Sequence, residues 1–282
     1  MIYVSSSCIR SPSIKDSIET LVQLGYRNIE LSGGTRPSDE LERDLLSLQD
    51  AHGINYLCHN YFPPPSKDFV LNVASLDEEI SELSVNHVLN AIKLSQKLGA
   101  DKFAFHAGFR INIPLAQIGK RIEKQALFEL QPCIDRFKTN LSKIRNAFPD
   151  MDLYVENNVV SQVNFASFES TDPFFLTNTS DLELISPFKP LVDVAHLKVS
   201  CNTLGLDLKE QLSHFFDLTD YVHVSDNNGF ADQNMGIDPK GTLIDHLKTQ
   251  NWKSKTVTLE VYSGSDDIQS SYNTISNLIG ES

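Results

Sequence analysis

Residues 77–106 read DEEISELSVNHVLNAIKLSQKLGADKFAFH, which combines a helical pattern with a strand. The first part, roughly Asp77–Leu98, is long and amphipathic, and it stops at Gly99, a residue that favours helix C-termini. The second part, Lys102–His106, is a short apolar run that ends in a histidine. This stretch therefore predicts a helix that leads into a buried strand.

The same alternation extends along the whole chain. Strands are predicted at Met1–Cys8, Asn28–Leu31, Asn55–His59, Lys102–His106, Asp152–Glu156, Pro190–Val194, Tyr221–Val224 and Thr256–Val261. Helices are predicted at Ser13–Leu24, Pro37–His52, Asp77–Leu98, Ile122–Ala147, Thr179–Leu184, Leu208–Phe216, Leu243–Gln250 and Asp267–Leu278. Such alternation requires parallel strands that are joined by right-handed crossovers.

Eight strand–helix units favour an α/β protein with a single (β/α)8 barrel domain, residues 1–282. A barrel of this type takes roughly 250 residues. An open dinucleotide-binding sheet would need a G-x-G-x-x-G motif after its first strand, and Ser5–Cys8 contains no glycine. We therefore expect the closed barrel.

The composition disfavours several classes of protein. The 24 Lys and Arg residues against 37 Asp and Glu residues give a net charge of −13, whereas nucleic-acid binding needs clustered cations. Four cysteines without a C-x-x-C pair indicate free thiols in a reducing compartment. There is no signal-peptide pattern and no apolar run close to the roughly 20 residues of a membrane span. We expect a soluble, cytoplasmic protein.

Six consecutive predicted strands end in a side chain that can bind a metal or transfer a proton. These side chains are His59, His106, Glu156, Asp193, His223 and Glu260. In (β/α)8 barrels the carboxyl ends of the strands form the active site. Asp193 and Glu260 lie in apolar runs, where an unpaired carboxylate would be costly.

The last four of these strand ends supply three carboxylates and one imidazole. This ligand set suits one divalent ion such as Mn²⁺, Mg²⁺, Co²⁺ or Zn²⁺. We therefore predict a metal site that consists of Glu156, Asp193, His223 and Glu260.

Two short motifs add candidate substrate contacts. Asp193-Val194-Ala195-His196 and His223-Val224-Ser225-Asp226 each place a carboxylate and an imidazole three positions apart. Because side chains alternate along a strand, Asp193 and His196 cannot both point inward from one regular strand. We expect His196 in a loop over the site, where it would bind substrate hydroxyls, and we include Asp226 as a second substrate contact.

The ordered set resembles the xylose isomerase-like barrel superfamily, which contains sugar isomerases and epimerases, inosose dehydratases and apurinic endonucleases of the endonuclease IV type. The likeness covers nearly the whole chain and is carried by HNYF at 59–62, FHAG at 105–108, VENN at 155–158, VDVAHLKVS at 192–200, HVSDNNG at 223–229 and LEVY at 259–262. The D-x-x-H and H-x-S-D motifs are its most specific part.

The resemblance implies a role for each matching residue. Glu156, Asp193, His223 and Glu260 would bind one divalent metal, and Glu156 and Glu260 would also act as an acid/base pair. His196 would orient the substrate. His59 and His106 would hold substrate or an additional metal.

One segment departs from the endonuclease pattern. That branch carries a D-x-H pair in the loop after strand seven, whereas this chain has Asp232-Gln233-Asn234. An amide is a poorer zinc ligand than an imidazole. The three-metal cluster of the endonucleases would therefore lack one ligand, and we expect neither nucleic-acid nor membrane partners.

These observations favour a metal-dependent isomerase or epimerase that acts on a small polyhydroxylated sugar or sugar phosphate. A metal would stabilise the enediolate, while two carboxylates remove and return a proton. An inosose-type dehydratase, an endonuclease-like enzyme and a non-catalytic sugar-binding protein stay open as alternatives, as does assembly into a homo-oligomer. The segment GIDPKG at 236–241, with Lys240, is either a phosphate site or, as we favour, a plain turn.

Overall fold

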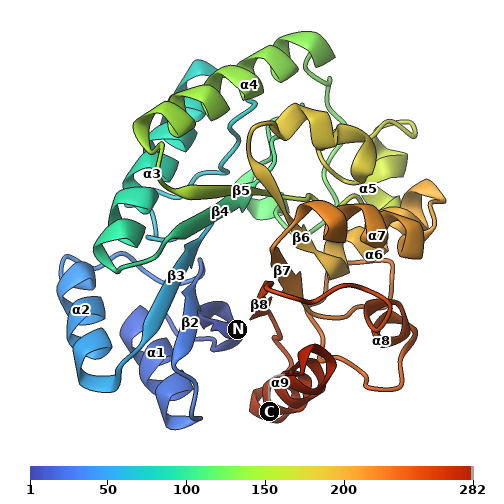
Figure 1. Ribbon diagram of the computed structural model, residues 1–282. Helices are drawn as coiled ribbons and strands as arrows, with labels where there is room; N and C mark the ends of the chain where they lie inside the picture. The colour runs from blue at the N-terminus through green and yellow to red at the C-terminus, as the bar shows by residue number, and fades with distance from the viewer. Residues whose placement is uncertain (281–282) are drawn as a thin grey trace.

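The computed structural model describes residues 1–280 and contains eight parallel strands in a closed barrel (Figure 1). The strands are β1 (Ile2–Ser5), β2 (Asn28–Leu31), β3 (Asn55–His59), β4 (Lys102–His106), β5 (Asp152–Glu156), β6 (Lys189–Asp193), β7 (Tyr221–Val224) and β8 (Thr256–Leu259). Each pairs with the next along the chain, and β1 pairs with β8. The predicted (β/α)8 barrel is confirmed, and the predicted domain extends two residues beyond the described part.

Helices surround the strands and cover the outside of the barrel (Figure 1). The α-helices are α1 (Ile14–Gln23), α2 (Leu41–His52), α3 (Glu78–Lys97), α4 (Leu130–Ala147), α5 (Gln162–Ser167), α6 (Val194–Leu204), α7 (Leu208–Leu218), α8 (Thr242–Leu247) and α9 (Ser265–Ile279). Three short 3₁₀ helices are η1 (Ser6–Cys8), η2 (Leu115–Gln117) and η3 (Thr179–Ile185). None of the helices within residues 1–280 is long and apolar enough to cross a membrane.

Helix α4 begins at Leu130, eight residues later than predicted. Pro132 explains the later start, because proline lacks a backbone N–H and is tolerated only in the first turn of a helix. The residues before it are held by other contacts. Ile122 is buried beside the barrel, and its N–H donates to Asn164 Oδ1 at 2.8 Å.

Other predicted boundaries also change. The first strand ends at Ser5, and the following residues form η1 instead of extending it to Cys8. The predicted helix at Thr179–Leu184 is the 3₁₀ helix η3. Helices α5 and α6 were not predicted.

Side chains inside the barrel form two layers. The lower layer is Tyr3, Leu57, Ala104, Tyr154, Leu191 and Tyr221, which pack together as one buried cluster. Residues two positions apart on a strand face the same side. On β3 to β7 the next inward positions are therefore His59, His106, Glu156, Asp193 and His223. The register of the strands thus places the chemically active side chains directly above the lower layer of aromatic and aliphatic residues.

Candidate metal and substrate site

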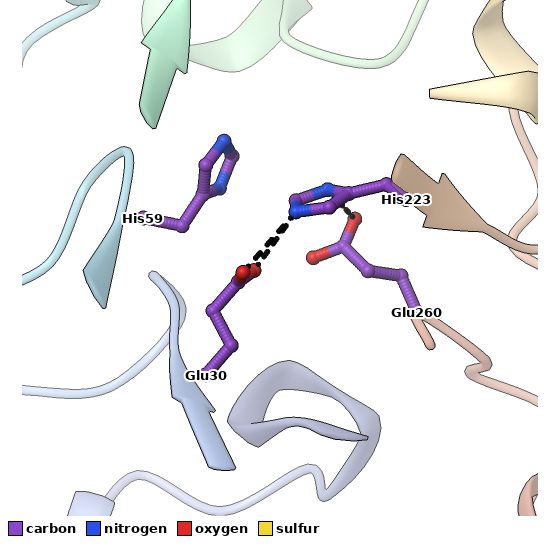
Figure 2. A group of neighbouring side chains, drawn as sticks. All are labelled: Glu30, His59, His223 and Glu260. Carbon is purple, nitrogen blue, oxygen red and sulfur yellow. Dashed lines mark hydrogen bonds and ion pairs between the residues drawn. The ribbon is translucent and has the colours of Figure 1, made fainter. Parts of the chain in front are cut away.

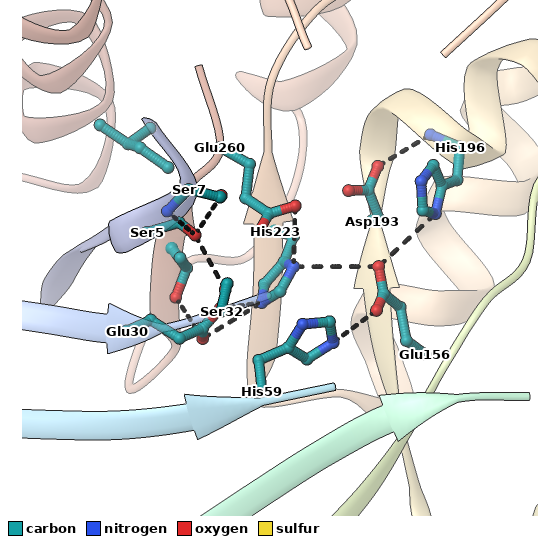
Figure 3. Close-up of polar contacts among 12 residues, drawn as sticks. Ser5, Ser7, Glu30, Ser32, His59, Glu156, Asp193, His196, His223 and Glu260 are labelled. Carbon is teal, nitrogen blue, oxygen red and sulfur yellow. Dashed lines mark hydrogen bonds and ion pairs between the residues drawn. The ribbon is translucent and has the colours of Figure 1, made fainter. Parts of the chain in front are cut away.

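Glu156, at the end of β5, is the centre of the upper layer. Its carboxylate lies 2.6 Å from His59 Nε2, 3.3 Å from His106 Nδ1, 3.5 Å from His196 Nδ1 and 3.8 Å from His223 Nδ1. The Glu156 side chain is only 1% exposed. Four imidazoles from four different parts of the chain therefore meet one buried carboxylate, and Figure 3 shows three of them, His59, His196 and His223.

The structure brings the four predicted metal ligands together. Ligand atoms of Glu156, Asp193 and His223 all lie within 4.8 Å of one another. Glu260 Oε2 lies 3.7 Å from His223 Nδ1, which Glu156 also faces. Figure 3 shows His223 between the two glutamates, with Asp193 beside them. The predicted ligands thus converge, although they come from four different strand ends.

Several buried atoms in this cluster make close ion-pair contacts but no well-aligned hydrogen bond among residues 1–280. They are both carboxylate oxygens of Glu156, Nε2 of His59 and Nδ1 of His106 and His223. Buried polar atoms in proteins are nearly always paired. A shared cation needs several oxygen and nitrogen atoms that lie close together and point at one centre rather than at each other. These residues provide that arrangement and therefore fit a divalent metal.

The same side chains strongly influence each other's protonation. Burial alone would raise the pKa of Glu156, but His106 and His59 outweigh it and hold that pKa well below its usual range. Burial alone would lower the pKa of His223, but Glu30 and Glu260 hold it well above its usual range. Burial also raises the pKa of Asp193 to about 7, although His196 opposes this. A bound cation would therefore displace protons from the cluster.

Glu30, on β2, is part of the site and was not predicted. It is fully buried, accepts hydrogen bonds from Tyr221 Oη and from Thr258 Oγ1 (2.9 Å), and lies 3.1 Å from His223 Nε2. Figure 2 shows it on the opposite side of the His223 ring from Glu260. One feature of the sequence could have revealed it: Glu30 is a charged residue at an inward position of the short predicted strand NIEL at 28–31.

Glu30 would determine which nitrogen of His223 becomes free when a bound cation displaces a proton from the ring. Because Nε2 faces Glu30, the proton of the neutral ring belongs on Nε2, and Nδ1 is left with a lone pair toward Glu156 and Glu260. A carboxylate behind a histidine in this way orients metal-binding histidines in general.

His196 lies in the first turn of α6, so its predicted place in a loop is wrong. Asp193 is the N-cap of this helix, and its carboxylate accepts a hydrogen bond from His196 N at 2.8 Å. The His196 ring still faces the cluster: Nδ1 is 3.0 Å from Asn157 O, and Nε2 is 3.3 Å from Asp232 Oδ2. A helix directly after the strand, rather than a loop, therefore positions this imidazole.

Asp226 is the predicted substrate contact that the structure does not bring into the cluster. Its Oδ1 accepts from Lys198 Nζ at 2.6 Å, and its backbone pairs with Met235. The ion pair is largely buried, with the two side chains 17% and 15% exposed. Asp226 therefore fastens α6 to the loop after β7.

The segment GIDPKG forms a turn, in which Asp238 Oδ1 accepts from Lys240 N at 2.9 Å. Lys240 is exposed, and the adjacent hollow of about 230 Å³ is lined by Asp238 and Asp267. Two carboxylates would repel a phosphate. The structure therefore favours the plain turn.

A cavity of about 1000 Å³ opens above the cluster. Its inner end is formed by His59, Glu260 and the partly exposed His106, and its outer part by the loops after β1, β2 and β3. This volume is at the upper end of the range for small-molecule sites. The cavity therefore reaches one side of the upper layer, whereas Glu156, Asp193 and His223 are buried behind it.

The fold and this site together define a (β/α)8 barrel with a buried cluster of histidines and carboxylates at the carboxyl ends of its strands. The sequence profile of the family described as xylose isomerase-like TIM barrel matches residues 18–277. The chain belongs to this family. A comparison with curated proteins returned no match.

Three solved structures illustrate the range of similar barrels. A D-tagatose 3-epimerase-like protein is 18% identical, with a TM-score of 0.72 over 99% of this chain and 98% of that one. An L-ribulose 3-epimerase is 15% identical, with a TM-score of 0.67 over 99% and 94%. Endonuclease IV from Thermus thermophilus is 15% identical, with a TM-score of 0.61 over 100% and 99%. Because the sequences are only 15–18% identical, these comparisons show that the proteins share a fold and nothing more.

Proposed function

We propose that this protein is a divalent-metal-dependent isomerase or epimerase of a sugar or sugar phosphate. The observation that carries the proposal is the pair of buried glutamates, Glu156 and Glu260, which lie 3.8 and 3.7 Å from the same nitrogen of His223. Two carboxylates on either side of one bound substrate are what removal and return of a proton require. The likeness in fold to an L-ribulose 3-epimerase and to a D-tagatose 3-epimerase-like protein supports the same class of reaction.

Glu156, Asp193, His223 and Glu260 would hold the metal, which would stabilise the negative charge that develops on the oxygens of the substrate. The lowered pKa of Glu156 keeps its carboxylate ionised, which is the form that binds a cation. The same carboxylate would accept the proton from the carbon beside the carbonyl. For an epimerisation, Glu260, which lies at the end of β8 and lines the cavity, would start protonated and would donate its own proton to the other face of that carbon. For an isomerisation, Glu156 would instead deliver the proton that it accepted to the neighbouring carbon. His59, His106 and His196 would bind hydroxyl groups around the reacting carbons.

The test uses solvent deuterium. The protein with its bound metal is incubated in D₂O with a panel of ketoses and ketose phosphates, and NMR records deuterium at the carbon beside the carbonyl. We expect E156Q and E260Q to reduce exchange about 10²–10⁴-fold, the usual contribution of a general acid or base. The control E42Q changes a glutamate that is 48% exposed and should retain full activity. Undiminished exchange in both site variants would refute the proposal.

A dehydratase of the inosose type would use the same metal and the same carboxylates. The NMR experiment separates the two reactions, because a dehydratase removes a hydroxyl group and produces an unsaturated or deoxy product. Loss of water without epimer formation would assign this protein to the dehydratases.

A second candidate function, cleavage of abasic DNA, is favoured by one observation. His59, His106 and Glu156 form a further group of ligand atoms within 4.8 Å, which shares Glu156 with the first group. Two adjacent metals suit phosphoester hydrolysis. Against this stands Asn234, at the position where the endonuclease pattern has a histidine. Metal analysis that gives more than one ion per chain, together with cleavage of an abasic oligonucleotide, would favour this candidate.

A further inference from the structure

The cavity above the cluster contains two arginines at its outer part. Arg10 follows η1 and Arg36 follows β2, and both are exposed residues that line the same cavity as His59 and Glu260. In a chain with a net charge of −13, this is a local excess of positive charge outside the metal cluster, where Asp68 is the one acidic lining residue.

Neither guanidinium group has an ion pair or hydrogen bond with another described residue. The chain has eight arginines, and those whose side chains are engaged are Arg27, Arg43, Arg110, Arg136 and Arg145. The third arginine without a contact in residues 1–280 is Arg121, which is exposed and does not line this cavity. Arg10 and Arg36 are therefore available for a ligand, and Arg121 is a natural control.

The two arginine loops are held beside each other. Arg36 N donates to Pro12 O at 2.8 Å, which ties the loop after β2 to the loop after β1. Ser32 N donates to Ser6 Oγ at 2.9 Å, and Ser5 Oγ donates to Ser32 Oγ at 2.9 Å. Figure 3 shows Ser5, Ser7 and Ser32 on the side of the cluster where Glu260 lies. The arginines thus belong to two fastened loops that meet at the cavity.

The same cavity also offers hydroxyl and backbone hydrogen-bond donors. Ser6, Ser7 and Ser32 line the cavity, and Gly33 and Gly34 contribute backbone to the same wall. A phosphate has three terminal oxygens and up to two negative charges, so it takes more donors than a carboxylate does. Two forked guanidinium groups with nearby hydroxyls match such a dianion.

We propose that Arg10 and Arg36 bind the phosphate group of a phosphorylated sugar whose reacting carbons lie over Glu156 and Glu260. The part of this inference that concerns the reacting end of the substrate rests on the proposed function. The anion site is argued separately, from the cavity and its two unpaired arginines. The arginines place the phosphate on the loops after β1 and β2 and not on the GIDPKG turn after β7.

The test measures binding of inorganic phosphate to the purified, metal-containing protein by isothermal titration calorimetry. We expect a millimolar dissociation constant for phosphate and weaker binding of acetate. R10Q and R36Q should each weaken phosphate binding about tenfold or more, because each removes a charge-assisted hydrogen bond. R121Q should leave the affinity unchanged. The same variants are then titrated with D-fructose and with D-fructose 6-phosphate, and only binding of the phosphorylated sugar should weaken.

Three outcomes would overturn the proposal. The first is that phosphate does not bind at millimolar concentration. The second is that phosphate binds R10Q and R36Q as tightly as the unaltered protein, which would locate the phosphate at the metal cluster. Acetate that binds more tightly than phosphate would assign the site to a carboxylate. The binding measurement does not depend on catalysis. If phosphate binds through both arginines but no sugar is converted, the proposed function is contradicted while the anion site is retained.

Discussion

At the scale of single residues, the position of Glu30 has the clearest consequence. Its buried carboxylate faces Nε2 of His223, so that Nδ1 points to Glu260 (Figure 2) and to Glu156 (Figure 3). Replacing Glu30 by glutamine retains the size of the side chain but removes its charge. An amide can also offer its NH₂ to the ring and so stabilise the tautomer that has no free Nδ1.

We therefore expect E30Q to weaken metal affinity about 10–100-fold, the usual effect of losing such a partner. The measurement is competition with a coloured chelator, alongside circular dichroism to check the fold. T258V is the matched control, because it removes one hydrogen bond to Glu30 and leaves the carboxylate in place. An affinity for metal that is equal in E30Q and the unaltered protein would contradict this role of Glu30.

At the scale of elements, Asp193 has two separable roles. It is a predicted metal ligand, and its side chain also caps helix α6 through the N–H of His196. Asparagine is as good an N-cap as aspartate, whereas alanine lacks the cap and costs about 1 kcal/mol. In EDTA we expect D193A to be about 1 kcal/mol less stable than D193N in urea unfolding. Both variants should lose metal affinity, and equal stability of the two would show that the cap contributes nothing.

The segment between α5 and η3 contains a second informative carboxylate. Burial raises the pKa of Asp172 to about 6, although hydrogen bonds from Thr177 and from the backbone of Phe174 oppose the shift. In the unfolded chain the group titrates near 3.9. Between these values the folded protein binds more protons, so the contribution of Asp172 to stability is present at low pH and is lost as the pH rises through about 6.

We expect D172N to remove this loss, which amounts to about 3 kcal/mol for a pKa that lies about two units above that of the unfolded chain. The measurement is the free energy of unfolding in urea at several pH values between 4 and 8, with EDTA present, for D172N and for the unaltered protein. The difference between them should change across this range in favour of D172N at higher pH. Parallel curves would show that Asp172 titrates normally.

At the scale of the whole molecule, the metal should contribute to stability. A ligand that binds only the folded state at a thousandfold excess over its dissociation constant contributes about 4 kcal/mol. We therefore expect EDTA to lower the melting temperature and Mn²⁺ or Zn²⁺ to restore it, as followed by differential scanning calorimetry. E156Q removes a charge at the centre of the cluster and should show little of this shift. A melting temperature that does not respond to EDTA or to added metal would argue against a resident cation.

The sequence predicted the barrel and the convergence of its strand ends because both depend on periodicity. It did not predict α6, since Val194, Leu197 and Val199 are all buried and this helix has no polar face to give a 3.6-residue pattern. Glu30 was missed because it lies within its strand rather than at the end, where we looked for chemistry. Which nitrogen of His223 is free depends on packing across the barrel, which no local pattern contains.

The two layers inside the barrel also bear on how such a protein changes over generations. Tyr154 and Glu156, like Tyr221 and His223, are neighbours on one face of a strand, yet only the second member of each pair lies in the candidate site. The lower member packs with the rest of its layer. A single nucleotide change can therefore exchange a reactive group while the residue beneath it keeps the strands together. A lineage built in this way can acquire new reactions without having to acquire a new fold.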